Sequence, residues 1–280
     1  MKADIVTIFP DFFRGPLEYG ITRRAQEMGL AKIEVHDLRE FTQDRHRTVD
    51  DRPFGGGEGM VLKPEPLFEC LESMGVAKRE ERAAGRVKES VVLLSAQGQR
   101  FTQKIAGDLA LLDRVVFICG RYEGVDERVA DHLADRELSI GDYVLSGGEF
   151  AAGVIVEAVM RLLPGAVGNQ ASTQQESFTV DAKAKRAGGA DSTCGSNGLL
   201  DYPHYTRPAE FRGIEVPEAL MSGNHEEIRR WRRQRALEKT LRNRPDLLEG
   251  VALSGEDKRF LAELRSGKQN TRLSEKSSRF

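Results

Sequence analysis

Hydrophobic positions in the first part of the chain follow the order that builds a parallel β-sheet. An apolar run at residues 3–9, which Pro10 ends, precedes apolar residues that recur at helical spacing from 17 to 28. Apolar and polar residues then alternate from 31 to 35, as in a half-buried strand. A strand, a helix and a second strand in this order predict the start of an α/β domain.

Three later apolar runs, at 90–95, 115–119 and 137–140, have the length of buried strands. Helical spacing separates the first two of them, and Thr102 stands where the N-cap of that helix is expected. The pattern therefore predicts that the α/β sheet continues to about residue 140.

Each of these three strands leads into a loop that contains glycine, at 96–98, 120–124 and 141–148. Ligands of open α/β sheets bind just beyond the carboxyl ends of the strands, so these loops predict one binding site. Glycine lets the backbone approach a ligand closely, although the glycines alone are more simply interpreted as tight turns. None of the loops has a nucleotide-phosphate pattern, which excludes the usual ATP and NAD cradles.

Two segments of the first half stand out from this alternation. Residues 45–60 have no periodicity and many glycines, which predicts a long exposed loop, either a flexible crossover or a functional segment. Residues 150–163 are apolar in every helical direction apart from Glu157 and Arg161. Such a helix is expected to be covered on all sides, by its own domain or by a second copy of the chain. The charged connection at 78–89 predicts a solvated surface.

The second half of the chain changes character twice. Residues 179–197 are small, polar and rich in glycine, which predicts a mobile linker. A helix expected after an Asn224 cap then carries seven arginines and one lysine against one glutamate between residues 228 and 244. This run is either a solvated face or a surface that neutralises phosphates, for which guanidinium groups are well suited. Ser254 begins a last short helix, and a disordered tail is expected beyond it.

Composition excludes several classes of protein. A chain of 280 residues with 39% hydrophobic residues predicts two domains, and a net charge of −2 excludes a uniformly basic nucleic-acid binder. Cys70, Cys119 and Cys194 have no paired spacing, and no leader or membrane-length apolar run is found. We therefore expect a soluble cytoplasmic protein. No histidine and cysteine spacing predicts a bound structural metal.

Several strings of the sequence resemble one enzyme family. CGRYEGVDERV (119–129) and SIGDYVLSGGE (139–149) closely resemble the cofactor loops of the bacterial tRNA (guanine-N1)-methyltransferases, members of the trefoil-knotted methyltransferase superfamily. RTVDDRPFGGGEGM (47–60) and GLLDYPHYTRP (198–208) are also typical of this family, the first near the target nucleotide. The resemblance extends from the first strand to the basic helix.

The resemblance implies both the organisation and the activity of the chain. It implies a knotted domain at 1–165 that binds S-adenosylmethionine, a linker with an insertion at 166–198, and a helical tRNA-binding domain at 199–268, before a tail at 269–280. The protein would be a homodimer with a shared active site. It would transfer a methyl group from S-adenosylmethionine to N1 of guanosine 37 in tRNA, and the family's reaction implies a magnesium ion.

The resemblance also implies roles for individual residues. Arg161 and Glu176 are the expected catalytic pair, because removal of the N1 proton suits a carboxylate and the charge that builds toward O6 suits a cation. Without the resemblance, they would be interpreted as a helix-end arginine and an exposed loop carboxylate. The expected cofactor-binding residues are Leu93, Leu94, Ala96, Gly120, Tyr122, Glu123, Ile140, Gly141, Tyr143, Leu145, Gly147 and Gly148. The expected tRNA-binding residues are Asp201, His204, Arg207, Arg229, Arg230 and Arg233.

Three features depart from the family pattern: Leu93 and Ala96 replace a usual aromatic residue and a usual proline, Glu176 replaces the usual aspartate, and residues 179–197 are extra. Two other functions stay open on the sequence. One is a knotted methyltransferase that acts on another RNA, and the other is a non-catalytic RNA-binding protein with the same fold.

Overall fold

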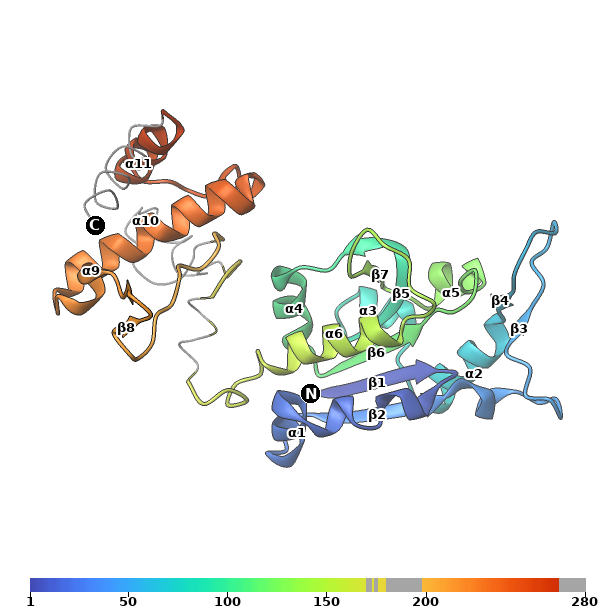
Figure 1. Ribbon diagram of the computed structural model, residues 1–280. Coiled ribbons are helices and arrows are strands. Elements are labelled where there is room, and N and C mark those ends of the chain that lie inside the picture. The colour runs from blue at the N-terminus through green and yellow to red at the C-terminus, as the bar shows by residue number, and fades with distance from the viewer. Residues whose placement is uncertain (170–172, 174–175, 180–197, 267–280) are drawn as a thin grey trace. The chain divides into compact units, whose positions relative to one another are not determined.

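Five parallel strands form the central sheet of the first part of the chain (Figure 1). The structure is a computed structural model that describes residues 1–169, 173, 176–179 and 198–266. The strands are β1 (Lys2–Thr7), β2 (Lys32–Asp37), β5 (Glu89–Arg100), β6 (Arg114–Cys119) and β7 (Arg136–Ser139), in the spatial order β2-β1-β6-β5-β7. Every neighbouring pair is parallel, which confirms the α/β prediction.

Helices cover both faces of this sheet, so its central strands are buried on each side. On one face lie α1 (Gly20–Glu27), α4 (Gln103–Ala110) and α6 (Glu149–Met160). On the other lie the 3-10 helix η3 (Leu38–Phe41), α2 (Pro64–Ser73) and α5 (Glu127–His132). The two-residue period of β5 divides its side chains between the layers, with Val92 in the first core and Val91 in the second.

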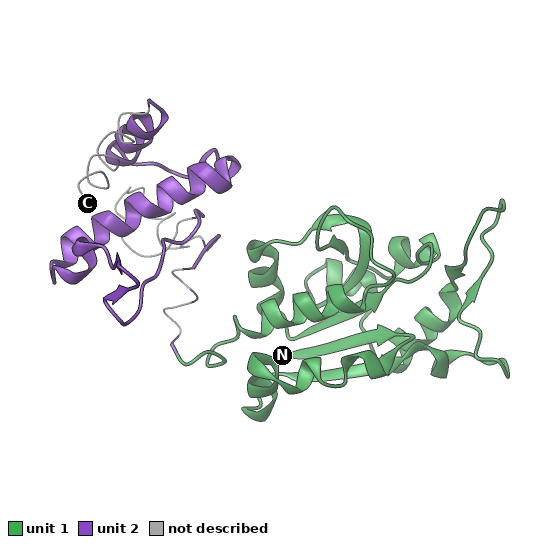
Figure 2. Cartoon of the chain, viewed as in Figure 1, with its two compact units in different colours: residues 1–168 green, residues 169–280 purple. Residues whose placement is uncertain are grey.

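The chain divides into two units, residues 1–168 and 169–280, each described here by itself (Figure 2). The second unit has a small core of Leu199, Leu237, Leu248, Phe260 and Leu261. Its elements are the strands β8 (Glu210–Phe211) and β9 (Ile214–Glu215), the helices α9 (Glu218–Met221), α10 (His225–Asn243) and α11 (Gly255–Arg265), and the 3-10 helix η4 (Pro245–Leu248).

The three predicted helix caps are confirmed. The Thr102 side chain accepts from Ile105 N before α4, and Asn224 Oδ1 accepts from Glu226 N at 3.1 Å before α10. Ser254 begins α11 in a reciprocal capping box with Asp257. Each side-chain oxygen satisfies a backbone N–H that a helix start would otherwise leave unpaired.

The helical pattern at residues 17–28 forms a shorter helix than predicted. The 3-10 helices η1 (Pro10–Phe13) and η2 (Pro16–Glu18) come first, and α1 begins only at Gly20. Gly15, with a φ of 94°, separates the two 3-10 turns in a backbone conformation that favours glycine.

The long exposed loop predicted at 45–60 is confirmed for most of its residues, but it contains a short strand and a buried Val49. The short strands β3 (Asp50–Asp51) and β4 (Val61–Leu62) pair antiparallel and form a hairpin that extends from the sheet (Figure 1). Val49 and Leu62 are fully buried, so two apolar residues anchor a segment whose composition is otherwise that of a loop.

The loop predicted at 96–98 is also different, because β5 continues through it to Arg100. Its register against β7 shifts between Leu94 and Gln99, which both lie opposite Leu138. The intervening residues therefore form a bulge at the end of a long strand rather than a free loop.

The charged connection at 78–89 contains α3 (Arg79–Ala83) and is not simply a solvated surface. Arg82 is 8% exposed, because its guanidinium pairs with Asp135 at 2.7 Å and donates to the carbonyl of Leu133. Paired in this way, a long cation can be buried between α3 and the chain before β7.

The predicted linker and tail, 179–197 and 269–280, lie outside the described residues except for Thr179. The backbone on either side of the linker is well defined, because Phe178 N donates to Leu199 O at 3.0 Å and Gly198 N to Thr179 O at 2.9 Å. The residues that flank the extra segment on its two sides are therefore neighbours in the structure. Across the described ranges, no helix combines the length and the apolar character that a membrane span requires.

Candidate functional site

A cavity of about 330 Å³ lies at the carboxyl ends of β5, β6 and β7. The β5 bulge and the loops after β6 and β7 enclose it, as the strand pattern predicted. All twelve residues expected to bind the cofactor line this one cavity: Leu93, Leu94, Ala96, Gly120, Tyr122, Glu123, Ile140, Gly141, Tyr143, Leu145, Gly147 and Gly148.

The loops after β6 and β7, residues 120–124 and 141–148, are joined to each other by their backbones. Gly148 N donates to Gly120 O at 2.9 Å, and Arg121 forms an isolated antiparallel bridge with Gly147. The cavity therefore lies within one connected arrangement of backbone groups.

Two of the glycines are needed because other backbone atoms lie against them. A Cβ on Gly148 would lie 2.8 Å from Cys119 Cα and 3.1 Å from Leu94 Cβ. In the β5 bulge, a Cβ on Gly98 would lie 2.5 Å from Leu138 N. The interpretation of the glycines after β6 and β7 as ordinary turn residues is therefore incorrect at Gly148, and close packing excludes a side chain at Gly98 as well.

The β3–β4 hairpin contacts the first of these loops directly. Glu123 N donates to Met60 O at 3.1 Å, Leu62 N to Gly124 O at 3.0 Å, and Asp126 N to Leu62 O at 2.9 Å. The strings at 47–60 and 119–129 are far apart in the sequence, yet the first of these hydrogen bonds joins them directly and the other two join the second string to Leu62, just beyond the first. The sequence pattern did not predict this pairing. The apolar Leu62, which follows the glycine-rich string and is buried in the structure, was the available signal for it.

Other lining residues were missed because they lie within predicted strands or beside the glycines. Ser95 and Gln97 come from the β5 bulge, and Glu137 and Ser139 from β7 itself. The Ser139 hydroxyl donates to Gly141 O at 3.0 Å, which shapes the start of the second loop.

The two expected catalytic residues belong to different units. Arg161 is the C-cap residue of α6 in the first unit, where its backbone N donates to Glu157 O at 3.2 Å. Glu176 is half-buried in the second unit, and its carbonyl accepts from Thr179 N at 3.3 Å.

The expected tRNA-binding arginines of α10 differ in their surroundings. Arg233 forms a bidentate ion pair with Asp257, at 2.9 and 3.1 Å, and so connects α10 to α11. Burial raises the pKa of Asp257, but the hydrogen bonds from Arg233 and Ser254 outweigh burial and place this pKa below its usual value. Arg229 and Arg230 are exposed, with carboxylates only at 3.9 and 3.8 Å.

The remaining expected tRNA-binding residues lie in the segment before β8. Asp201 Oδ2 lies 2.9 Å from His204 Nε2, and the His204 ring lies 4.7 Å from that of Tyr202. The Arg232 guanidinium of α10 lies over the other aromatic ring, 4.9 Å from the centroid of Tyr202. Arg207 is exposed.

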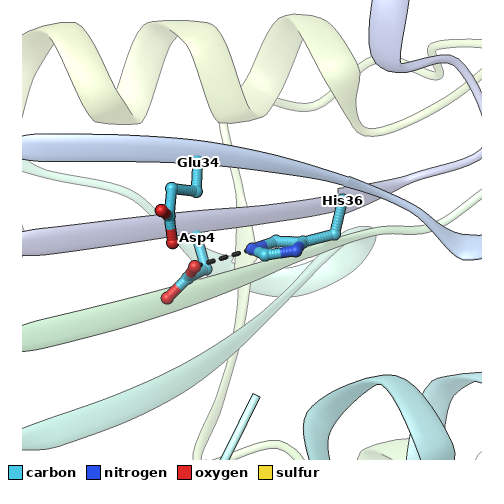
Figure 3. Close-up of side chains that lie close together, drawn as sticks. All are labelled: Asp4, Glu34 and His36. Carbon is cyan, nitrogen blue, oxygen red and sulfur yellow. Dashed lines mark hydrogen bonds and ion pairs between the residues drawn. The ribbon is translucent and has the colours of Figure 1, made fainter. Parts of the chain in front are cut away.

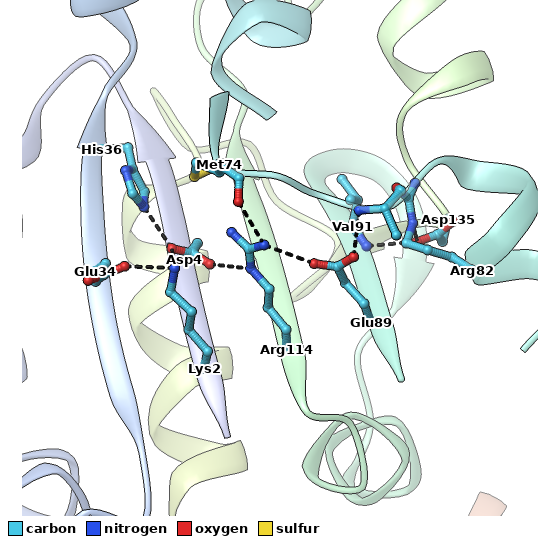
Figure 4. Close-up of polar contacts among 11 residues, drawn as sticks. Lys2, Asp4, Glu34, His36, Met74, Arg82, Glu89, Val91, Arg114 and Asp135 are labelled. Carbon is cyan, nitrogen blue, oxygen red and sulfur yellow. Dashed lines mark hydrogen bonds and ion pairs between the residues drawn. The ribbon is translucent and has the colours of Figure 1, made fainter. Parts of the chain in front are cut away.

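A separate charged cluster lies at the amino ends of the strands. Asp4, Glu34 and His36 bring their ligand atoms within 4.8 Å of one another (Figure 3). Lys2 Nζ lies between the carboxylates, at 3.1 Å from Asp4 and 2.7 Å from Glu34. An ammonium group thus supplies the charge that a metal ion would bring, and the cluster is an ion-pair network (Figure 4).

Asp4 is the fully buried centre of this network. Its carboxylate accepts from Arg114 Nε at 2.7 Å and is hydrogen-bonded to His36 Nε2 at 2.7 Å (Figure 4). Burial alone would raise the pKa of Asp4, but the hydrogen bonds from His36 and Arg114 hold it at about 2. The network joins β1, β2 and β6 at the end of the sheet opposite the cavity.

Comparison with known proteins agrees with this geometry. A family model described as tRNA (Guanine-1)-methyltransferase TrmD matches residues 1–250. The chain belongs to this family. The tRNA (guanine-N(1)-)-methyltransferase of Koribacter versatilis is 65% identical over 268 residues, which are 96% of this chain and 100% of that protein. Those of Dictyoglomus turgidum and Bacillus cereus are 49% and 47% identical over 95% and 96% of the chain, and 97% and 100% of their own lengths.

Within this family, the two departures at the β5 bulge affect different parts of the cavity. The Leu93 side chain is 3% exposed in the second core, so it reaches the cavity mainly through its backbone. Ala96 is exposed at the rim, where it leaves more space than the usual proline would.

Proposed function

We propose that this protein transfers a methyl group from S-adenosylmethionine to N1 of guanosine 37 in tRNA. The observation that carries the proposal is the meeting of the family's two loop strings around one cavity, with the hairpin string hydrogen-bonded to the first of them through Met60. The twelve lining residues expected from the resemblance all come from these two strings and from β5, at and just before its bulge.

The cavity suits a flat heterocycle with an attached amino acid. Its rim combines backbone N–H and C=O groups with apolar side chains such as Ile140 and Leu145, and close packing at Gly148 keeps side chains out. Bound here, S-adenosylmethionine would supply an activated methyl group on its sulfonium.

Glu176 and Arg161 are the residues proposed to act on the base. The Glu176 carboxylate would accept the N1 proton as this nitrogen attacks, and the Arg161 guanidinium would stabilise the negative charge that builds on O6. Glutamate in place of aspartate keeps the acceptor group and adds one methylene.

Residues 199–268, which lie within the second unit, are proposed as the tRNA-binding domain. The exposed Arg229 and Arg230 can neutralise phosphates, whereas Arg233 already has Asp257 as its partner. A base beside the anticodon lies in a single-stranded loop, where a protein can reach its edge. The linker at 166–198 would connect this domain to the first, and the insertion at 179–197 within it is proposed to have no catalytic role.

A homodimer with a shared active site is also proposed, and the outer face of α6 supports it. This helix was predicted to be covered on all sides, by its own domain or by a second copy. Within one chain its outer face stays uncovered, because Phe150 and Val154 are 63% and 49% exposed. A second copy would cover them. The proposal includes the trefoil knot, which the family resemblance implies, and a cytoplasmic location, which the unpaired cysteine spacing indicates.

The magnesium ion that the family resemblance implies remains part of the proposal. Within the described residues, the group of three side chains with metal-ligand spacing is the Asp4 cluster, which Lys2 already neutralises. Mg²⁺ is usually held by only one or two carboxylates together with water and substrate, so it does not require such a group.

The test is methyl transfer from labelled S-adenosylmethionine to an unmodified tRNA with guanosine at position 37, beside a transcript with adenosine there. We expect transfer to the first alone. Transfer to neither transcript, despite cofactor binding, would favour another RNA substrate. Absence of cofactor binding would favour a non-catalytic RNA-binding protein.

A further inference from the structure

A buried carboxylate beside the cavity has no role in the chemistry described so far. Glu149, the first residue of α6, is only 3% exposed although a glutamate at a helix start usually faces water. Its Oε1 accepts from the Thr7 hydroxyl at 2.8 Å, and its Oε2 accepts from Arg121 Nη1 at 3.4 Å. Burial of a charge is unfavourable unless such partners are present.

These contacts close into a ring with the end of β1. The Thr7 hydroxyl, 1% exposed, accepts from Phe9 N at 3.0 Å while it donates to Glu149. The Arg121 guanidinium lies over the Phe9 ring, 4.6 Å from its centroid. We call Thr7, Phe9, Arg121 and Glu149 the Glu149 ring.

The Glu149 ring joins three segments that are separate in the sequence. Thr7 and Phe9 come from β1 and the residues after it, Arg121 from the loop after β6, and Glu149 from the helix that follows the 141–148 loop. Arg121 is also the residue whose backbone bridges Gly147. The ring therefore stabilises the point where the two cofactor loops meet.

The second loop has a glycine, Gly147, at the position where a side chain would meet this ring. A Cβ on Gly147 would collide with the Glu149 carboxylate and would lie 2.6 Å from Arg121 Nη1. Glycine at 147 thus leaves the space through which the ion pair forms. The ring explains why this loop has a glycine here, as close packing against Cys119 explains Gly148.

We propose that Glu149 is a positioning residue, which acts through Arg121 and Thr7 to hold the 120–124 and 141–148 loops together in the arrangement that binds S-adenosylmethionine. This inference rests on the proposed function for its ligand. It assigns no contact between Glu149 and the reacting atoms. Loss of the ring would lower the fraction of molecules whose cavity is ready for the cofactor, and the apparent affinity falls by that fraction.

The first test compares Glu149→Gln with the matched exposed variant Glu72→Gln on α2. The amide can still accept from Thr7 but removes the charge that pairs with Arg121. We expect the dissociation constant and the KM for S-adenosylmethionine to rise about tenfold with kcat within about threefold of wild type, since a loop held less firmly weakens binding rather than chemistry. A lower kcat with unchanged KM and dissociation constant would overturn the positioning role.

Thr7 supplies a second, conservative comparison. Thr7→Val keeps the shape but leaves Glu149 Oε1 and Phe9 N without their partner, whereas Thr7→Ser keeps the hydroxyl. We expect Thr7→Val to weaken cofactor binding about as much as Glu149→Gln, and Thr7→Ser to restore most of the affinity. Equal affinities for the valine and serine variants would argue against the ring.

A readout without any ligand separates this inference from the proposed function. In Glu149→Gln, amide hydrogen exchange should become faster at 120–124 and 141–148 while β1 and β6 keep their protection. Unchanged exchange in the loops, or equal acceleration across the sheet, would overturn the inference. If the wild-type protein methylated no tRNA but the loops loosened selectively, only the proposed function would fail.

Discussion

At the scale of single residues, the base assigned to Glu176 is the most direct point to test. Glu176→Gln removes the proposed proton acceptor and keeps the length of the side chain, so we expect methyl transfer to fall about 100-fold or more while S-adenosylmethionine binding is retained. Glu176→Asp, which keeps the carboxylate, is the matched control and should retain most activity. Full activity of the glutamine variant in the labelled-methyl assay would contradict this role.

Gly148 tests whether close packing shapes the cavity. Its Cβ would meet the backbone of Cys119 at 2.8 Å, so Gly148→Ala should lower the free energy of unfolding by about 1–3 kcal/mol and weaken cofactor binding. Gly153→Ala in the interior of α6 is the control, because nothing lies within 4 Å of its Cβ. There, alanine should stabilise the helix by about 0.5–1 kcal/mol. Thermal denaturation of both variants measures these changes in stability. Equal shifts in melting temperature would contradict the role of close packing at Gly148.

Residue-level patterns predicted local structure better than long-range pairing. Thr102, Asn224 and Ser254 were identified as caps because their bonds reach only a few residues along the chain. The burial of Arg82 was missed, since its partner Asp135 lies 53 residues away and a charged run gives no sign of such a contact. The Glu149 ring was missed for the same reason, because Thr7 and Glu149 lie 142 residues apart in the sequence.

At the scale of elements, alternation and helical spacing located the five strands of the sheet, but not how their ends are shaped. The bulge in β5 depends on Gly98 against the backbone of β7, and the β3–β4 hairpin depends on the carbonyl and amide of Leu62. Both are backbone contacts between distant segments, which side-chain patterns do not encode. The family resemblance, rather than the pattern, selected the residues of the cavity.

The segment at 180–197 gives a prediction at this scale. Its two ends are hydrogen-bonded to each other through Phe178 with Leu199 and Thr179 with Gly198, so a short Gly-Gly link can replace it without moving either end. We expect the shortened protein to keep its melting temperature and to retain methyl transfer within about twofold. A folded but inactive deletion would show that the insertion contributes to the site.

At the scale of the whole molecule, the exposed face of α6 predicts how two chains associate. Val154→Glu places a charge on a face that a second copy is proposed to cover, and we expect the variant to sediment as a monomer. Leu111→Glu, at the C-cap residue of α4 that is 76% exposed, is the control and should leave association unchanged. A dimeric Val154→Glu protein would place the interface elsewhere.

The stability of the first unit should depend on acid through Asp4. The pKa of this carboxyl is about 2 in the folded chain against an ordinary 3.8, because the hydrogen bonds of His36 and Arg114 outweigh burial. A lowered pKa stabilises the fold above about pH 4, and this contribution, about 2 kcal/mol, is lost as pH falls toward 2.

Asp4→Asn should flatten the dependence of unfolding free energy on pH between about 2 and 4. Asp11→Asn, at a surface carboxyl that is 74% exposed, is the comparison and should leave the dependence as it is. Denaturant unfolding at several pH values measures both. An unchanged slope in Asp4→Asn would assign the acid sensitivity to other carboxyls.

The three hydrogen bonds between the β3–β4 hairpin and the 120–126 segment provide a physical link through which the binding of one ligand can change the affinity for another. A nucleotide held by the hairpin and a cofactor held by the adjoining loop would act on the same backbone contacts. Thermodynamic linkage then requires reciprocity: whatever factor the cofactor contributes to RNA affinity, the RNA returns to cofactor affinity. If that factor exceeds one, each substrate of the reaction strengthens the binding of the other to the same extent before any bond is made.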